Sequence, residues 1–381
     1  NDYVQYITWL KSNTPTISDN ITNLMAAYGT ISYSFRNIFT VNANTRYDGS
    51  NKFGSRSNEK LLPIWSVSSA WNLSEHELFK VSWIDYLSLK ISYGYQGNML
   101  DGQSPVMLIR NNPIDTYYNK FTSSVSTYAN PKLRWEKTGS FNAGTEIFLF
   151  NRRLQLSGDW YYKRTTDAFM DKPVSSINGQ TSYTVNSGKV INRGFNISVT
   201  ATPVRTKDVQ WSLSTSYSKT KNEMTTEPGQ ETYELSNFLN GTALIKGKAV
   251  GTFYSYKFIG LNPLDGGPMF DDYEDRIDEL KGLGKYDTFT KVLTSSGRRE
   301  PIISGSLNNT ITWKNIRIGL TLAYSLGAKT RLFKLYNFNN ANSYENLIYP
   351  EDNINRTFIN RWQKPGDEAH TNIPAFFSQH N

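Results

Sequence analysis

Alternation of apolar and polar residues is the dominant pattern along this chain, and it recurs many times. In residues 209–218, Val, Trp, Leu, Thr and Tyr occupy the odd positions, and Gln or Ser the even ones. In residues 316–326, Ile, Leu and Tyr occupy every even position. Successive side chains of a β-strand point to opposite faces of the sheet, so this period of two predicts strands with one apolar and one polar face.

The pattern predicts about ten such strands, separated by turn residues. Many of them are roughly ten residues or longer, which is the length that a tilted strand needs to cross a bilayer, whereas soluble strands average about five or six. Helical periodicity is almost absent; one short helix is predicted at residues 74–83, where Ser74 and Glu77 could form a capping box. The predicted strands are 28–35, 38–47, 62–73, 85–95, 135–149, 153–165, 188–202, 209–222, 301–313 and 316–327.

The connections between these strands alternate between short and long. Short turns are predicted at 36–37, 151–152, 203–208 and 314–315, and long segments at 48–61, 96–134, 165–189, 221–300 and after 327. Outer-membrane barrels have short turns on the periplasmic side and long loops outside, with aromatic girdles near the strand ends. The predicted fold class is therefore all-β, a transmembrane antiparallel β-barrel, of which this chain supplies only part.

Composition narrows the chemistry. The 381 residues carry a net charge of +8, include no Cys, and have only three widely separated His. Thiol catalysis, Cys-based zinc sites and Fe–S clusters are thereby excluded. The basic residues are dispersed, which argues against nucleic-acid binding. The sequence contains no stretch of 18 apolar residues, so it predicts no transmembrane helix.

Several segments resemble the SusC/RagA-type TonB-dependent transporters of the Bacteroidetes outer membrane. The strings TRYDGSNKFG (45–54), ISYGYQGN (91–98), NPKLRWE (130–136), YYKRTTD (161–167), NRGF (192–195) and RWQKPGDE (361–368) follow the order of that family's motifs. The resemblance implies TonB-dependent import of a nutrient, most often an oligosaccharide and in some members a peptide. It also implies a 22-stranded plugged barrel, with residues 1–381 belonging to its C-terminal part. A signal peptide, a TonB box, the plug, the early strands and the final strands are then expected outside this sequence. The implied partners are a SusD-like lipoprotein lid, TonB and outer-membrane lipid.

Candidate site residues fall into two groups. Aromatic residues in the long loops are candidates for stacking on cargo or packing against the lid, and packing within the loops is the alternative. Charged residues on the polar faces are candidates for lining the lumen or contacting the plug. The loop candidates are Tyr117, Tyr118, Tyr254 and Tyr256, and the lumen candidates are Arg46, Lys90, Glu146 and Asp159.

One other interpretation remains open from the residues alone. A secreted or surface all-β module could hold glycans through its loop aromatics without transport. An enzyme is not predicted, because no catalytic motif occurs and a Glu146–Asp159 pair in a polar lumen is explained by chance. No cofactor is predicted; the acidic run at 271–279 offers oxygen ligands for Ca²⁺ but lacks the EF-hand spacing, which favours a solvated loop surface.

Overall fold

A computed structural model describes most of the chain. The described residues are 2–12, 23–50, 61–77, 79, 81–98, 107–115, 117–118, 120–130, 132, 134–173, 177, 182–226, 233–331 and 356–375. No helix among them is long and apolar enough to span a membrane.

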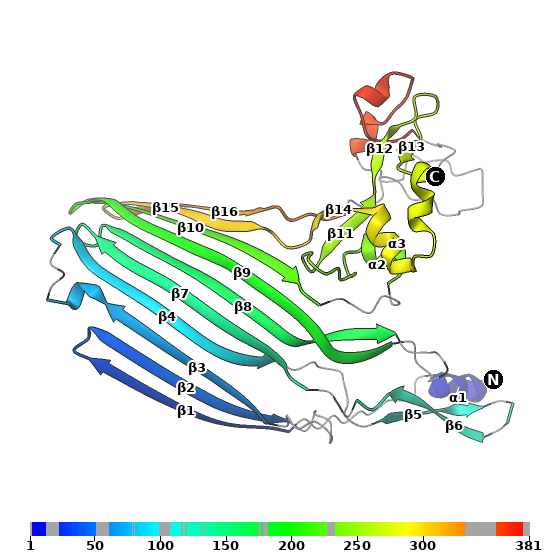
Figure 1. Ribbon diagram of the computed structural model, residues 1–381, viewed down its shortest axis with the longest axis horizontal. Helices are drawn as coiled ribbons and strands as arrows, with labels where there is room; N and C mark the ends of the chain where they lie inside the picture. The colour runs from blue at the N-terminus through cyan, green and yellow to red at the C-terminus, as the bar shows by residue number, and fades with distance from the viewer. Residues whose placement is uncertain are drawn as a thin grey trace.

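One antiparallel sheet of ten strands dominates the structure, and all ten predicted strands are confirmed (Figure 1). Each strand pairs with the next strand of the sheet in chain order, as in an up-and-down barrel wall, and the sheet is not closed within the described residues. The strands are β1 (Leu24–Phe35), β2 (Phe39–Ser50), β3 (Leu61–Asn72), β4 (Ile84–Asn98), β7 (Glu136–Leu149), β8 (Leu154–Pro173), β9 (Ser182–Arg205), β10 (Val209–Met224), β15 (Ile303–Trp313) and β16 (Ile316–Leu326).

The short turns lie at one end of the sheet and the long connections at the other, as the parity of the connections predicts (Figure 1). Backbone geometry makes the short turns tight, because their residues have positive φ values. Arg36 and Asn37 have φ of 50° and 58°, and Lys314 has φ of 50°. Left-handed residues match the twist of a two-stranded hairpin, which lets these turns join long paired strands directly.

The helix predicted at residues 74–83 is wrong. Among the described residues of this segment only a three-residue 3-10 turn, η1 (Leu73–Glu75), forms, and His76 already has an extended backbone with ψ of 131°. The hydroxyl of Ser74 makes no hydrogen bond in the described structure, so the expected capping box is absent. The adjacent strand end is tethered instead, since the Asn72 amide donates to the carbonyl of Asn37 at 2.7 Å and accepts from the Tyr86 hydroxyl at 2.9 Å.

The predicted loop at 165–189 is also wrong over much of its length. β8 continues to Pro173 and β9 begins at Ser182, and the two strands remain paired out to Pro173 and Ser182. A register shift between Thr165 and Ala168 interrupts the alternation at that point. The bulge changes the face on which the following side chains emerge. The alternation of period two is broken there, so the sequence pattern does not predict that the strand continues.

The remaining long connections contain small elements of their own. The connection after β4 carries a hairpin, β5 (Leu108–Asp115) and β6 (Lys120–Thr127). The connection between β10 and β15 folds into α2 (Leu235–Leu239), β11 (Thr252–Tyr256), β12 (Phe258–Leu261), β13 (Pro268–Phe270), η3 (Glu274–Leu280), α3 (Lys285–Val292) and β14 (Leu293–Arg298). The turns η4 (Arg356–Asn360) and η5 (Asp367–Ala369) follow β16, and α1 (Asp2–Ser12), which the pattern does not predict, precedes β1.

The apolar face of the sheet remains exposed along its length. On β16, for example, Ile318, Leu320 and Leu322 are 68%, 55% and 51% exposed. Soluble proteins seldom leave so continuous an apolar surface open to water, whereas the outer face of a membrane barrel is covered by lipid.

Candidate functional site

The opposite face of the sheet presents rows of hydroxyl and amide groups that bond to one another across the strands. These contacts extend from the β1–β2 pair to the β10–β15 pair. Because the side chains of one row satisfy each other, the face is an ordered polar surface with further donors and acceptors directed away from the sheet. The pairs are Ser32–Asn42 (2.7 Å), Asn44–Ser66 (3.3 Å), Ser92–Asn142 (3.1 Å), Asn196–Ser218 (2.7 Å) and Ser216–Ser306 (2.9 Å).

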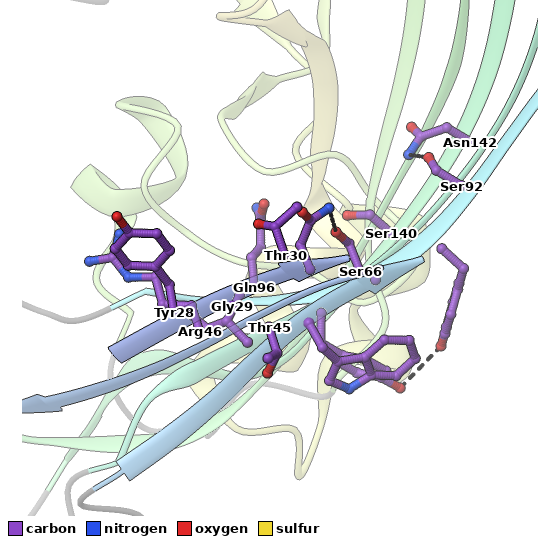
Figure 2. Close-up of a pocket in the computed structure, with 16 residues that line it drawn as sticks. Tyr28, Gly29, Thr30, Thr45, Arg46, Ser66, Ser92, Gln96, Ser140 and Asn142 are labelled. Atoms are coloured by element: carbon purple, nitrogen blue, oxygen red, sulfur yellow. Dashed lines mark hydrogen bonds between the residues drawn. The ribbon is translucent and has the colours of Figure 1, made fainter. Parts of the chain in front are cut away.

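A hollow of about 470 Å³ lies on this face toward the long-loop ends of β1–β4 and β7. Figure 2 shows Ser66, Ser92, Ser140 and Asn142 on the same side of the strands, with Thr45 on the opposite side. Among the charged candidates, Arg46 lies here, and its Nε is 2.5 Å from a carboxylate oxygen of Asp48.

A second hollow, of about 530 Å³, brings the other three charged candidates together. The Lys90 ammonium is 2.5 Å from the Glu146 carboxylate, and the Asp159 carboxylate accepts a hydrogen bond from the Asn196 amide at 2.7 Å. All four candidates therefore line hollows of the polar face, each with a neighbour of complementary polarity. Contact with a plug stays a prediction.

Three loop aromatics lie at the surface. Tyr117 and Tyr118, between β5 and β6, are 87% and 70% exposed, and their rings meet edge to face with centroids 4.9 Å apart. Tyr256, at the end of β11, is 39% exposed and packs edge to face against Phe270 with centroids 6.2 Å apart. Rings held in this way can stack against a flat ligand, and the role in ligand binding stays a prediction.

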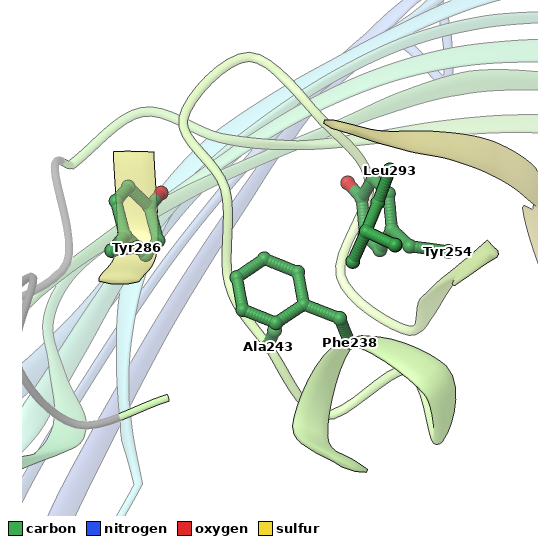
Figure 3. Close-up of a cluster of buried hydrophobic side chains, with 5 residues drawn as sticks. All are labelled: Phe238, Ala243, Tyr254, Tyr286 and Leu293. Carbon is green, nitrogen blue, oxygen red and sulfur yellow. The ribbon is translucent and has the colours of Figure 1, made fainter. Parts of the chain in front are cut away.

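Tyr254 lies inside the long loop between β10 and β15 and is only 3% exposed. It belongs to a core, here called the loop core, formed by Phe238, Ala243, Tyr254, Tyr286 and Leu293 (Figure 3). Burial raises the pKa of the Tyr254 phenol to about 12. In this structure Tyr254 is not accessible to a ligand; it packs within its own loop, which was the alternative interpretation.

An arginine after β16 is bonded to the loop core, and the pattern of the sequence does not predict it. The Arg331 guanidinium donates to the carbonyl oxygens of Leu239 and Tyr254, the latter at 2.5 Å. This contact joins segments 77 to 92 residues apart in sequence. The loop between β10 and β15 and the segment after β16 are thus parts of one folded unit.

The acidic run at 271–279 forms ion pairs with neighbouring cations. The Arg276 guanidinium contacts both Asp271 carboxylate oxygens at 2.6 and 2.8 Å and lies 4.0 Å above the ring of Tyr273. Hydrogen bonding to Arg276 lowers the pKa of Asp271. Among the described residues, no three His, Cys, Asp or Glu side chains gather closely enough to hold a metal ion.

The late RWQKPGDE string has a structural role that its sequence alone does not indicate. The indole of Trp362 packs directly on Gly266, where an added Cβ would come within 2.4 Å of the ring. The Trp362 Nε1 donates to the Glu368 carboxylate at 2.9 Å, and this bond is the largest cause of a lowered Glu368 pKa. Residues 356–375 thereby dock on the β12–β13 hairpin.

Comparisons with known proteins agree with this geometry. Residues 1–288 match the family model described as TonB dependent receptor-like, beta-barrel. The TonB-dependent receptor P39 of Formosa agariphila is 30% identical over 71% of this chain and 26% of its own length. The TonB-dependent receptor SusC of Bacteroides thetaiotaomicron is 27% identical over 80% of this chain and 31% of its own length. The chain thus spans about a quarter to a third of these curated relatives.

Solved structures show the same fold. A structure of the RagAB peptide transporter superposes with a TM-score of 0.74 at 24% identity, covering 94% of this chain and 38% of the other. The RagAB peptide importer in its closed-closed state superposes with a TM-score of 0.68 at 25% identity, covering 80% and 33%.

Proposed function

This chain belongs to the family of TonB-dependent receptor-like β-barrels, and we propose that it forms part of the wall and outer loops of a nutrient importer. The family and the strand-rich fold place it in the bacterial outer membrane. One observation carries the import proposal: a ten-stranded sheet has an exposed apolar face on one side and a bonded polar face on the other. In a secreted binding module this apolar face would be exposed to water, which soluble proteins seldom allow over so continuous a surface.

The polar face would line the lumen. Its Ser, Thr and Asn rows and the partnered charges Lys90, Glu146 and Asp159 provide a wet surface on which a plug can rest and past which cargo can move. In this proposal TonB acts through the plug, which is a separate part of the whole protein.

An oligosaccharide is the proposed cargo. Aromatic rings that stack on sugar faces and hydroxyl or amide groups that bond to sugar hydroxyls are both present, in the Tyr117–Tyr118 pair and in the polar rows. A peptide is the competing cargo, since the superposed RagAB structures are described as a peptide transporter and importer.

A SusD-like lipoprotein is the proposed lid over the long-loop end. The loops between β10 and β15 form a packed unit, and several apolar side chains remain exposed on it. These are Phe258 (39%), Ile259 (59%), Leu264 (86%) and Phe270 (45%). Exposed apolar groups on a rigid support are typical of a protein–protein contact.

The experiment is an uptake assay with the full-length protein, which compares labelled oligosaccharides with labelled peptides in cells that have or lack TonB. We expect TonB-dependent uptake of an oligosaccharide and co-purification of a stoichiometric lipoprotein from detergent extracts. The Tyr117→Ala/Tyr118→Ala double variant should raise the KM for uptake, and Ile109→Ala, on the same hairpin and 63% exposed, should not. Uptake of peptides alone would refute the cargo; uptake independent of TonB would refute the import mechanism.

A further inference from the structure

The short turns of the sheet carry an excess of positive charge. The described turn segments are 36–38, 150–153, 206–208 and 314–315, and each contains at least one Lys or Arg. All of these cations are exposed, and the one carboxylate within the four segments is Asp208. The cations are Arg36, Arg152, Arg153, Lys207 and Lys314.

The side chains of these turn cations make no ion pair with a described carboxylate, whereas several cations of the polar face and the long loops do. None of the ten ion pairs that join described residues includes a turn cation. In the long loops, by contrast, Arg276, Lys285 and Lys291 each meet a carboxylate of the same chain. The same end also carries the carboxylates of Glu75, Glu77, Asp85 and Asp208, and the Asp85 carboxylate accepts a hydrogen bond from the Arg152 backbone N–H at 2.8 Å. The Arg36 and Lys314 side chains make no ion pair with any of these described carboxylates.

Two of the turn cations lie against aromatic rings of the apolar face. The Arg36 guanidinium lies 5.4 Å from the ring centre of Phe35, and the Lys314 ammonium 5.9 Å from that of Trp313. Phe35 ends β1 on the face of Ile31 and Tyr33, and Trp313 ends β15 on the face of Ile311. Both rings remain about half exposed, at 50% and 55%.

Arg152 is a turn cation that lies against an aromatic ring of the polar face, unlike Arg36 and Lys314. It lies 5.6 Å from the ring centre of Phe148, which shares the polar face with Glu146 and Asn142 and packs against Tyr86. Arg152 has the same charge and a similar left-handed backbone, with φ of 58° against 50° for Arg36. It is directed to the inside of the wall, whereas Arg36 and Lys314 are directed to the lipid side.

Aromatic rings of a membrane barrel lie at the level of the lipid headgroups, so a cation resting on such a ring meets headgroup phosphates. Each Lys or Arg near an anionic membrane surface strengthens binding about five-fold. We propose that Arg36 and Lys314 each bind the phosphate of an anionic phospholipid headgroup in the periplasmic leaflet. The Lys314 N–H donates to the carbonyl of Asp208 at 2.8 Å, which brings the two turns together, and the opposite charges of Lys207 and Asp208 leave Lys314 as the cation of the second site.

The inference depends on the position of the sheet in the membrane and not on import, so its failure leaves the proposed function untouched. It is tested with the full-length protein in lipid nanodiscs that contain phosphatidylcholine and phosphatidylglycerol. Native mass spectrometry then counts the lipids that remain bound. The variants are Arg36→Asn and Lys314→Asn, with Arg152→Asn as the matched control. Asn tolerates φ near +50°, so all three substitutions preserve the turn.

We expect each of the first two variants to lower the ratio of retained phosphatidylglycerol to phosphatidylcholine about five-fold at its site, and the double variant to lose both sites. Arg152→Asn should retain the wild-type ratio. Equal losses in all three variants, or none, would overturn the proposal. Displacement of the lipid by millimolar inorganic phosphate would also overturn it, because the turns would then bind any phosphate. So would capture of a periplasmic polymer by the same two residues.

Discussion

Replacement of Phe238 by Ala tests whether the loop between β10 and β15 is a folded unit or only a surface connection. Phe238 is completely buried, and its ring meets those of Tyr233, Tyr254, Tyr286 and Phe289 with centroids 6.1, 5.9, 6.1 and 5.3 Å away. A buried Phe→Ala change costs about 3–5 kcal/mol, because transfer energy is lost and a cavity remains. That cost corresponds to a roughly 10²- to 10⁴-fold rise in the open population of the loop core.

The effect should be confined to the loops, since the sheet draws its stability from strand pairing and lipid. Hydrogen exchange of the full-length protein in detergent, followed by mass spectrometry, should show faster exchange in residues 233–298, with little change in the sheet strands β7–β10, β15 and β16. Leu264→Ala is the control, because Leu264 lies in the same loop and is 86% exposed. It should leave the exchange pattern unchanged.

Exchange of Phe238→Ala at the wild-type rate would refute this prediction, because the loop core would then contribute nothing to local order. Faster exchange of the whole sheet together with the loop would also refute it, because the two would then form one cooperative unit. Binding of the lid protein, measured in parallel, should weaken in Phe238→Ala as its contact surface loses its support.

Three further predictions concern single groups. The pKa of the buried Tyr254 phenol is about 12 rather than 10, because the fold favours the neutral phenol. The loop core should therefore keep its full stability below pH 10 and lose it as the pH rises toward 12. Limited proteolysis measures this loss, and Tyr254→Phe should abolish it. Gly194→Ala would place a Cβ 2.3 Å from the Lys219 carbonyl oxygen and should cost about 1–3 kcal/mol in a urea unfolding titration, whereas Gly158→Ala, with its nearest atom at 3.8 Å, should cost much less. Glu146→Gln should shift the same titration by less than about 1 kcal/mol, since its ion pair is partly exposed; a larger shift would show that the pair is structural.

The sheet could be predicted from the sequence because its signal is local. The even positions of β16 hold Ile, Leu and Tyr without interruption, and the partner strand β15 shows a matching alternation around Leu307 and Ile311. Such a period specifies both the strand and the face of each side chain. It failed at 165–189, where a bulge breaks the period, and at 74–83, where the helical signal was too short to outweigh the direct pairing of β3 with β4.

The candidate site could be predicted only in part. Lys90, Glu146 and Asp159 lie on three adjacent strands, each at a polar position of a strand whose side chains alternate between polar and apolar. Their common face therefore follows from the sequence, and the register of the strands brings them into one hollow. Trp362 gave no such signal, because its partner Gly266 is a loop residue 96 positions earlier.

Sequence by itself determined the ten strands, the polar and apolar faces and the end at which the long loops lie, because each depends on neighbours one or two residues away. Tertiary structure alone decided which loop aromatics are buried. Tyr254 and Tyr256 are two residues apart on β11, yet one is 3% exposed and the other 39%. Their difference depends on Phe238, Tyr286 and Leu293, which reach Tyr254 only after the chain has folded back on itself. Burial in a loop is a property of non-local contacts, and a local pattern carries no record of them.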